Sequence, residues 1–150
     1  MNSAWPAKPM ISQSFACDIV IAADNAVFSI AEVRWGLTAA IVIPELSAAI
    51  SARQLRRYAL TGERFDAEEA HRIGLVHQVV ALQDLAAAGA AMIERLLDNA
   101  PLAMAETKEL LIEPADRDAL LLRHAAKRQS EEAREGLAAF AEKRAARWSR

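Results

Sequence analysis

The sequence has little of what several protein classes require. One cysteine, Cys17, in 150 residues excludes an intrachain disulfide framework and is typical of a reducing compartment. Lysine and arginine number 18 against 20 aspartates and glutamates, so the basic patch of a general nucleic-acid binder is missing. The longest apolar run without a charge, 35–44, is about half a membrane span. These absences predict a soluble, cytoplasmic protein with no nucleic-acid partner and no membrane partner.

Catalytic signatures are also missing. The chain has no glycine-rich dinucleotide fingerprint, no P-loop, no nucleophile elbow and no zinc-protease motif. His71, His77 and His124 stand apart without neighbouring cysteines or an acidic ligand pattern, which predicts no metal site. Cys17 lies in a short apolar stretch and is expected to be a buried, unreactive residue.

What is present is the composition of a globular, helix-rich chain. Hydrophobic residues make up 53% and charged residues 25%, with only five glycines and five prolines. A chain of this length buries roughly 68–70% of its unfolded surface, enough for one core. We therefore expect one structural unit of the α/β class.

Periodicity and punctuation predict the elements. Short β-branched runs indicate strands at 16–22, 27–30 and 76–80. Helical spacing, caps and prolines indicate helices at about 44–50, 52–60, 66–73, 82–97, 101–112, 116–133 and 136–147. The unit is thus expected to have a strand-containing part, 1–80, followed by a helical part, 81–150.

Two groups of polar side chains could carry chemistry. Glu32 follows a short strand among apolar residues, and a carboxyl group in such surroundings is suited to proton transfer. A glutamate facing water and paired with Arg34 is the alternative. Arg53, Arg56 and Arg57 share one helix and could hold a phosphate or a carboxylate, or form an ordinary solvated face.

Several stretches together resemble the crotonase (enoyl-CoA hydratase/isomerase) superfamily, in its order and spacing from 16 to 148. They are Ala16–Ala23, Phe28–Val33 with Gly36 and Leu37, Leu60–Phe65 with Ala67–Ala70 and Ile73–Val76, and Glu135–Phe140 with Glu142–Arg144. Within the superfamily, 34–50 and 56–58 look most like methylglutaconyl-CoA-type hydratases.

The resemblance implies the C-terminal part of a crotonase-like ββα fold and chemistry on acyl-CoA thioesters. Two backbone N–H groups hold the thioester oxygen in this family, and hydratases place two glutamates around one water. Glu32 matches the second glutamate, while Phe140 and Lys143 match positions that contact the CoA adenine and phosphates. No metal and no redox cofactor is implied. The partners implied are acyl-CoA and further copies of the chain, in a trimer or hexamer.

The chain also departs from the family pattern. It resembles an N-terminally truncated and internally shortened member, because only Ser12–Phe15 separate Lys8–Ile11 from Ala16, where the family has an oxyanion-hole segment. Ser29 and Ala31 replace the usual glycine and proline beside the acid.

Three functions stay open at this point. The first is an enoyl-CoA hydratase-type lyase, the second an enoyl-CoA isomerase, and the third a catalytically inactive acyl-CoA-binding or oligomeric structural subunit. Leucines and a phenylalanine of the last helices offer a surface for assembly or, alternatively, an intramolecular core: Leu120, Leu121, Leu122, Leu137 and Phe140.

Overall fold

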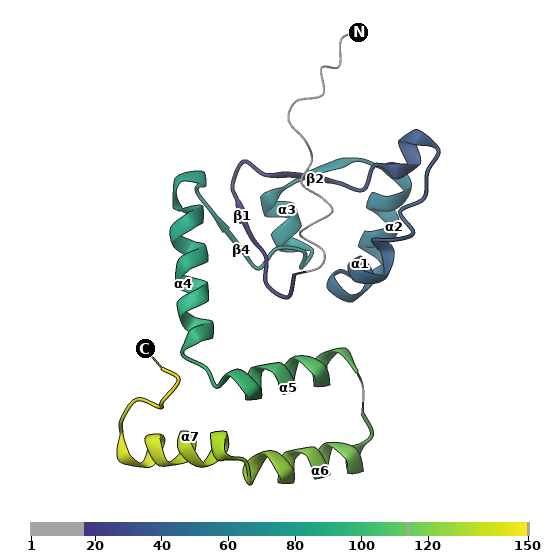
Figure 1. Ribbon diagram of the computed structural model, residues 1–150. Coiled ribbons are helices and arrows are strands. Elements are labelled where there is room, and N and C mark those ends of the chain that lie inside the picture. Colours follow the sequence, from purple (N-terminus) through teal and green to yellow (C-terminus); the bar gives the residue numbers. More distant parts are fainter. Residues whose placement is uncertain (1–16, 114, 150) are drawn as a thin grey trace. The chain divides into compact units, whose positions relative to one another are not determined.

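The computed structural model describes residues 17–113 and 115–149. The chain divides into two compact units, Met1–Gly89 and Ala90–Arg150 (Figure 1). The mixture of a few short strands with many helices confirms the predicted α/β class. The expected division into 1–80 and 81–150 within one structural unit stays a prediction.

Two pairs of short strands organise the first unit. Strand β1 (Ile21–Ala23) runs parallel to β4 (Gln78–Val80), with Ala22 opposite Val79. Strand β2 (Val27–Ser29) runs antiparallel to β3 (Arg64–Asp66), with Phe28 opposite Phe65. A parallel pair needs a long crossover connection, and the segment 24–77 between β1 and β4 contains the other strand pair and most of the helices of this unit.

The helical elements that lie within the first unit are short. They are the single turn η2 (Glu32–Trp35), α1 (Ile43–Ala49), α2 (Ala52–Thr61), α3 (Ala67–Arg72) and the turn η3 (Leu82–Asp84). Both α2 and α3 begin at a residue whose side chain accepts a hydrogen bond. The Ser51 hydroxyl accepts from the Gln54 N–H and caps α2. The Asp66 carboxylate accepts from the Glu69 N–H and caps α3, as the spacing of these two residues predicts.

An aromatic cluster forms the centre of the core in this unit. The Tyr58 and Phe65 ring centroids lie 4.1 Å apart, and those of Phe28 and Phe65 lie 5.7 Å apart. Ile30 and Leu46 complete the cluster, and Ile30 is only 1% exposed. The end of β2, the end of α2 and the start of β3 are therefore fixed together by apolar burial.

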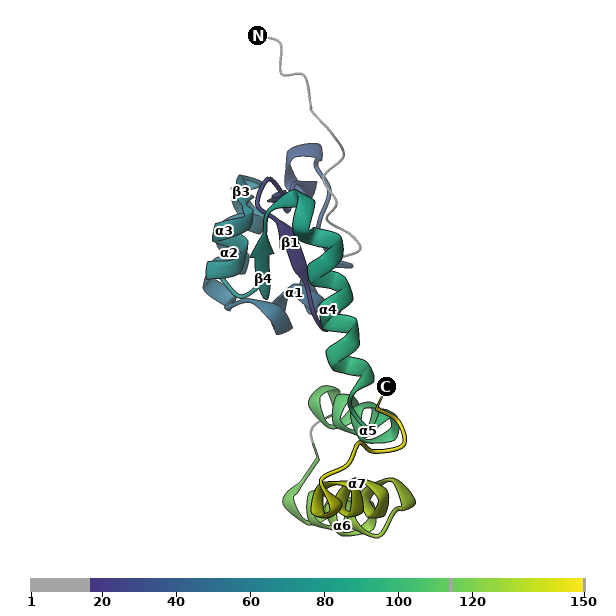
Figure 2. The same cartoon turned by 90° about the vertical axis from the view of Figure 1, so that its left-hand side faces the viewer.

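Four helices follow the strands (Figure 2). Helix α4 (Leu85–Leu97) begins in the first unit, and α5 (Pro101–Ile112), α6 (Arg117–Arg128) and α7 (Glu131–Glu142) belong to the second. Asp116 caps α6 and Ser130 caps α7. None of the helices in the described part of the chain is both long enough and apolar enough to span a bilayer.

Three predicted details are wrong. Cys17 is exposed and lies outside any strand, because the β1–β4 ladder begins only at Ile21. The last two helices separate at Ser130 and not at Gly136, which lies inside α7, where a Cβ would stand 3.3 Å from the Trp148 ring. Strand β3 has no counterpart in the prediction, because Arg-Phe-Asp is short and mostly polar and is a strand only through its pairing with β2.

Candidate functional site

Glu32 opens the single turn η2, three residues after Ser29, the buried end of β2. The turn is closed by its own backbone: the Arg34 N–H donates to the Ala31 carbonyl at 2.9 Å, and the Leu37 N–H donates to the Glu32 carbonyl at 3.0 Å. Gly36 ends the turn with φ +71°, in the left-handed region that glycine tolerates. Glu32 is therefore half-buried at the edge of a rigid, hydrogen-bonded turn.

The apolar neighbours of Glu32 do not enclose it within the first unit. Val33, Trp35 and Leu37 are all exposed, with Trp35 at 69%. One turn of helix that lies on the surface buries none of its residues, which the apolar sequence alone does not reveal. The exposed side chains of Trp35 and Leu37 follow Glu32 closely in the sequence and are apolar.

Two side chains fasten this turn to the end of α2. The Ser29 hydroxyl donates to the Gly62 carbonyl at 3.1 Å, and the Arg34 Nε–H donates to the same carbonyl oxygen at 2.9 Å. Ser29 is 3% exposed, and Gly62 is buried. The residues on both sides of Glu32 are thus tied to one backbone atom.

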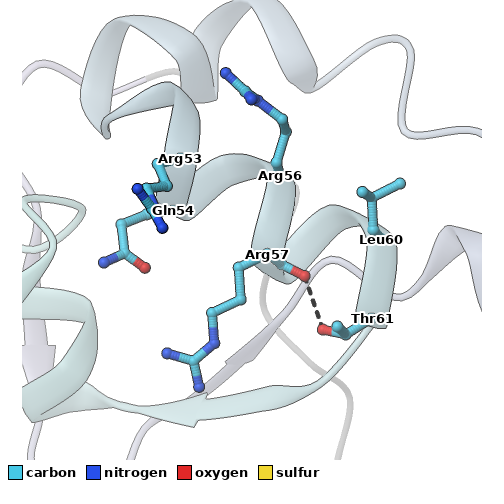
Figure 3. Close-up of a pocket in the computed structure, with 6 residues that line it drawn as sticks. All are labelled: Arg53, Gln54, Arg56, Arg57, Leu60 and Thr61. Atoms are coloured by element: carbon cyan, nitrogen blue, oxygen red, sulfur yellow. Dashed lines mark hydrogen bonds between the residues drawn. The ribbon is translucent and has the colours of Figure 1, made fainter.

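The arginines of α2 form an exposed face around a shallow hollow of about 470 Å³ (Figure 3). Arg57 donates to Glu63 at 2.6 Å, and this hydrogen bond raises the pKa of the Arg57 guanidinium. Arg56 and Arg57 point away from each other in Figure 3, so the guanidinium groups do not converge on one ligand position. This arrangement favours the solvated-face alternative over an anion site.

Phe140 and Lys143 lie at the C-terminal end of α7. The Phe140 ring is 85% exposed. Lys143 is the C-cap of the helix with φ +54°, and its N–H donates to the Phe140 carbonyl at 3.3 Å. The neighbouring Arg144 pairs with Glu135 at 2.7 Å and with Glu142 at 2.6 Å. The helix end therefore carries an exposed aromatic residue and an exposed lysine, followed in the sequence by an arginine that acidic partners already hold.

The structure brings Phe140 and Lys143 together in the second unit, whereas Glu32 belongs to the first. The predicted positions Lys8–Ile11 and Ser12–Phe15, where the family has its oxyanion-hole segment, lie outside the described residues. The roles of Glu32, Phe140 and Lys143 stay predictions.

Two of the three histidines, His71 and His77, take part in backbone contacts. The His71 Nδ1 atom lies 2.9 Å from the Val76 carbonyl, and His77 Nδ1 accepts from the Val20 N–H at 3.1 Å. Among residues 17–113 and 115–149, no three His, Cys, Asp or Glu side chains are grouped so that they could hold a metal ion.

Two partly buried polar networks were not predicted. The Tyr58 hydroxyl donates to Glu69 at 2.6 Å, and Glu69 also receives a hydrogen bond from the Arg72 guanidinium at 2.6 Å. In the second unit, Glu132 accepts from the N–H groups of Leu102 and Ala103. A tyrosine in an otherwise apolar helix face is the one sequence signal for the first network, since a buried hydroxyl needs a partner.

Comparison with known proteins places this chain in a family. The model of the enoyl-CoA hydratase/isomerase family matches residues 12–150. A carnitinyl-CoA dehydratase from Citrobacter koseri is 32% identical and aligns with 90% of this chain. A crystal structure of an enoyl-CoA hydratase from Shewanella pealeana is 39% identical, covers 90% of this chain and superimposes with a TM-score of 0.81. An enoyl-CoA hydratase/isomerase from Marinobacter aquaeolei is 34% identical over 91% of this chain, with a TM-score of 0.83.

The chain spans about half the length of these relatives, from 53% of the Shewanella protein to 56% of the Citrobacter protein. The match to the Citrobacter protein runs over 151 positions but contains 90% of this 150-residue chain, about 135 residues, so about 16 positions hold none of its residues. The resemblance to the superfamily is confirmed, the closer likeness to methylglutaconyl-CoA-type hydratases stays a prediction, and the chain belongs to the enoyl-CoA hydratase/isomerase family.

Proposed function

We propose that this chain acts on a 2-enoyl-CoA thioester as an enoyl-CoA hydratase-type lyase, with Glu32 as the acid. The observation that carries the proposal is the placement of Glu32, at its family position, on a closed turn directly after β2. In hydration, a base takes a proton from water while the water oxygen bonds to Cβ. Glu32 in its acid form gives a proton to Cα, so that H and OH add across the double bond.

The thioester oxygen gains negative charge during this addition and needs hydrogen-bond donors. One such donor is worth on the order of 3–4 kcal/mol of barrier. The donors that the family resemblance implies fall before Cys17, outside the described residues. Hydration by this chain therefore requires that donors and a base stand near Glu32 in the working protein.

Phe140 and Lys143 are proposed to bind the CoA portion of the substrate. An exposed aromatic ring provides a surface on which an adenine stacks, and an ammonium group pairs with phosphate oxygens. The exposure of both side chains supports this role. The reaction adds water without changing the overall oxidation state, so a redox cofactor has no part in it.

An enoyl-CoA isomerase is the second candidate. Moving a double bond along the acyl chain needs a proton taken from one carbon and returned to another, which one carboxylate can do alone. Glu32 is the single carboxylate that the family motifs identify in the described part of the chain, and this observation keeps isomerisation as a candidate beside hydration.

An inactive acyl-CoA-binding or oligomeric structural subunit is the third candidate. The apolar side chains predicted to mediate assembly are exposed in the second unit, including Leu122 at 73% and Leu137 at 57%. Exposed clusters of this kind mark interaction surfaces. We propose a homo-oligomer, a trimer or hexamer, in which these side chains become buried.

Turnover of short acyl-CoA substrates tests the proposal. Hydration is followed by the loss of the conjugated thioester absorbance of a 2-enoyl-CoA, and isomerisation by its gain from a 3-enoyl-CoA. Glu32→Gln should reduce either activity at least about 10²-fold, as expected for loss of a general acid or base. Glu45→Gln, an exposed glutamate in α1, is the matched control and should leave the rate unchanged.

Each outcome selects one candidate. Loss of absorbance that requires Glu32 supports the lyase, and a gain that requires Glu32 supports the isomerase. If folded protein turns over neither substrate, the two enzymatic candidates are rejected. The inactive acyl-CoA-binding or structural subunit is then the remaining candidate.

A further inference from the structure

The Gly62 carbonyl oxygen is the meeting point of two donors that flank Glu32 in the sequence. Ser29 stands three residues before Glu32, and Arg34 stands two residues after it. Their side chains donate to this one oxygen at 3.1 Å and 2.9 Å. A carbonyl has two lone pairs, so both donors can be satisfied by it at the same time. The segment 29–34 is thereby closed into a loop with Glu32 on it.

We propose that Ser29, Arg34 and Gly62 form an anchor that positions the Glu32 carboxyl for proton transfer. This inference rests on the proposed function and adds to it three positioning residues, none of which touches the substrate. The family usually has glycine at the position of Ser29. The hydrogen bond from the Ser29 hydroxyl is therefore made by a side chain that the usual glycine lacks.

The acceptor is itself held firmly. Gly62 is the C-cap of α2 with φ +58°, and its N–H donates to the Tyr58 carbonyl at 2.9 Å. Tyr58 belongs to the aromatic cluster and is 1% exposed. The position of the Gly62 oxygen is thus fixed by the most deeply packed part of the unit and not by the surface turn that it holds.

The fit between Arg34 and Gly62 also requires glycine. A Cβ at position 62 would stand 2.9 Å from Arg34 Nε and 3.1 Å from Arg34 Cγ. The arginine stem therefore crosses directly over the place where any other residue would have its side chain. The positive φ and this close approach together explain why glycine ends the Leu-Thr-Gly stretch of the family-like block.

The anchor is expected to hold the Glu32 carboxyl at the distance from the substrate that proton transfer requires. Proton transfer needs the donor within hydrogen-bond reach of its target, and a displacement of about 1 Å can cost up to two orders of magnitude in rate. The one-turn helix buries none of its residues, and the bonds of Arg34 in the turn and of Ser29 in β2 both connect its segment to the Gly62 carbonyl oxygen.

Two substitutions of Arg34 separate the hydrogen bond from the charge. Arg34→Gln removes the charge but keeps an N–H donor where Nε stands, whereas Arg34→Met keeps the length of the stem and has no donor. We expect Arg34→Met to lower kcat about five- to tenfold with KM unchanged, and Arg34→Gln to stay within about twofold of the parent. Ser29→Ala should act in the same direction as Arg34→Met. Arg53→Met, which removes an unanchored arginine from α2, should have no effect.

Hydrogen–deuterium exchange provides a second measurement that needs no turnover. Arg34→Met should speed exchange of the amides of 31–37 about five- to tenfold while the amides of α3 exchange as in the parent. A role in overall stability alone would speed exchange in both segments equally.

The two measurements keep the proposals apart. If the parent has no turnover but exchange changes only in 31–37, the anchor stands and the enzymatic function fails. If Arg34→Met and Arg34→Gln behave alike, or if exchange rises uniformly, the anchor is rejected whatever the activity.

Discussion

At the scale of single residues, the carboxylate of Glu69 is the most strongly perturbed acid of the first unit. Hydrogen bonds from Arg72 and from Tyr58 lower the pKa of Glu69 to about 2 from a usual value of 4.5. Burial, followed by the bond to Glu69, raises the pKa of Tyr58 to about 12. The network links the aromatic core to α3, so the ionisation of Glu69 is coupled to folding.

The sign of this coupling gives a prediction for acid stability. Because the pKa of Glu69 is lower in the folded chain than in the unfolded chain, its charged form stabilises the fold. The contribution is complete above about pH 4.5 and is lost as the pH falls towards 2. Allowing for solvent screening of a partly exposed pair, we expect Glu69→Gln to lower the free energy of unfolding by about 1–2 kcal/mol at pH 6.

Urea unfolding of parent and variant at pH 6 and at pH 3 measures this effect. The difference between the two proteins should shrink at pH 3. Glu68→Gln, the exposed neighbour, should follow the parent at both pH values. A difference of equal size at pH 6 and pH 3 would mean that Glu69 acts through packing rather than through charge.

The sequence predicts such residues only in part. The three-residue spacing of Asp66 and Glu69 correctly predicts the capped start of α3, because a cap depends on local backbone geometry. It cannot predict that Tyr58, eleven residues away from Glu69, reaches its side chain. The bonds of Ser29 and Arg34 to Gly62 span 33 and 28 residues and are equally invisible in local patterns.

At the scale of elements, the side chain of Glu132 joins three helices of the second unit. It accepts from the Leu102 and Ala103 N–H groups at the start of α5, at 2.9 and 2.8 Å, and from Lys127 of α6 at 2.9 Å. Burial raises the pKa of Glu132, but the bond from Lys127 and those two N–H groups outweigh it, so the pKa lies below its usual value. Helix α5 thus receives from α7 the cap that its own N-cap residue, Ala100, cannot provide.

Glu132→Ala should therefore destabilise the second unit more than an ordinary surface substitution. It leaves the two helix N–H groups without an acceptor and Lys127 with Glu106 as its remaining acidic partner, which predicts a loss of about 2–3 kcal/mol in the free energy of unfolding. Glu131→Ala removes the neighbouring exposed glutamate from the same helix turn and should cost no more than about 0.5 kcal/mol. Thermal unfolding followed by far-ultraviolet circular dichroism compares them, and equal costs would contradict the capping role.

Helix boundaries show where local rules are sufficient. Prolines and caps correctly place α1, α2 and α5 to within a residue or two, because these signals act within one turn. Gly136 wrongly predicts a helix boundary, although it lies inside α7. The Trp148 ring approaches it closely, and local sequence patterns do not reveal this tertiary contact. Strand β3 is missed for the same reason, since its partner β2 lies far away in the sequence.

At the scale of the whole molecule, the family is indicated by motifs that follow one another in the family's order and spacing from residue 16 onwards. Such motifs identify the fold better than periodicity does, because each one marks a turn or a close approach that few residues permit. The anchor at Gly62 is one example. Exposure, in contrast, cannot be read from the motifs: the apolar residues of α6 and α7 could equally have formed an internal core.

Their exposure in the structure leads to a prediction about assembly. Leu121 and Leu122 are 57% and 73% exposed on α6, and water contact of side chains this large is unfavourable by about 1.5–3 kcal/mol each relative to burial. We expect the parent to form a trimer or hexamer at micromolar concentration, measured by size-exclusion chromatography with light scattering. Leu121→Asp with Leu122→Asp should lower the mass without changing helix content, whereas Leu60→Asp, an equally exposed leucine of α2, should leave it unchanged. A folded parent that elutes as a monomer would reject assembly through α6.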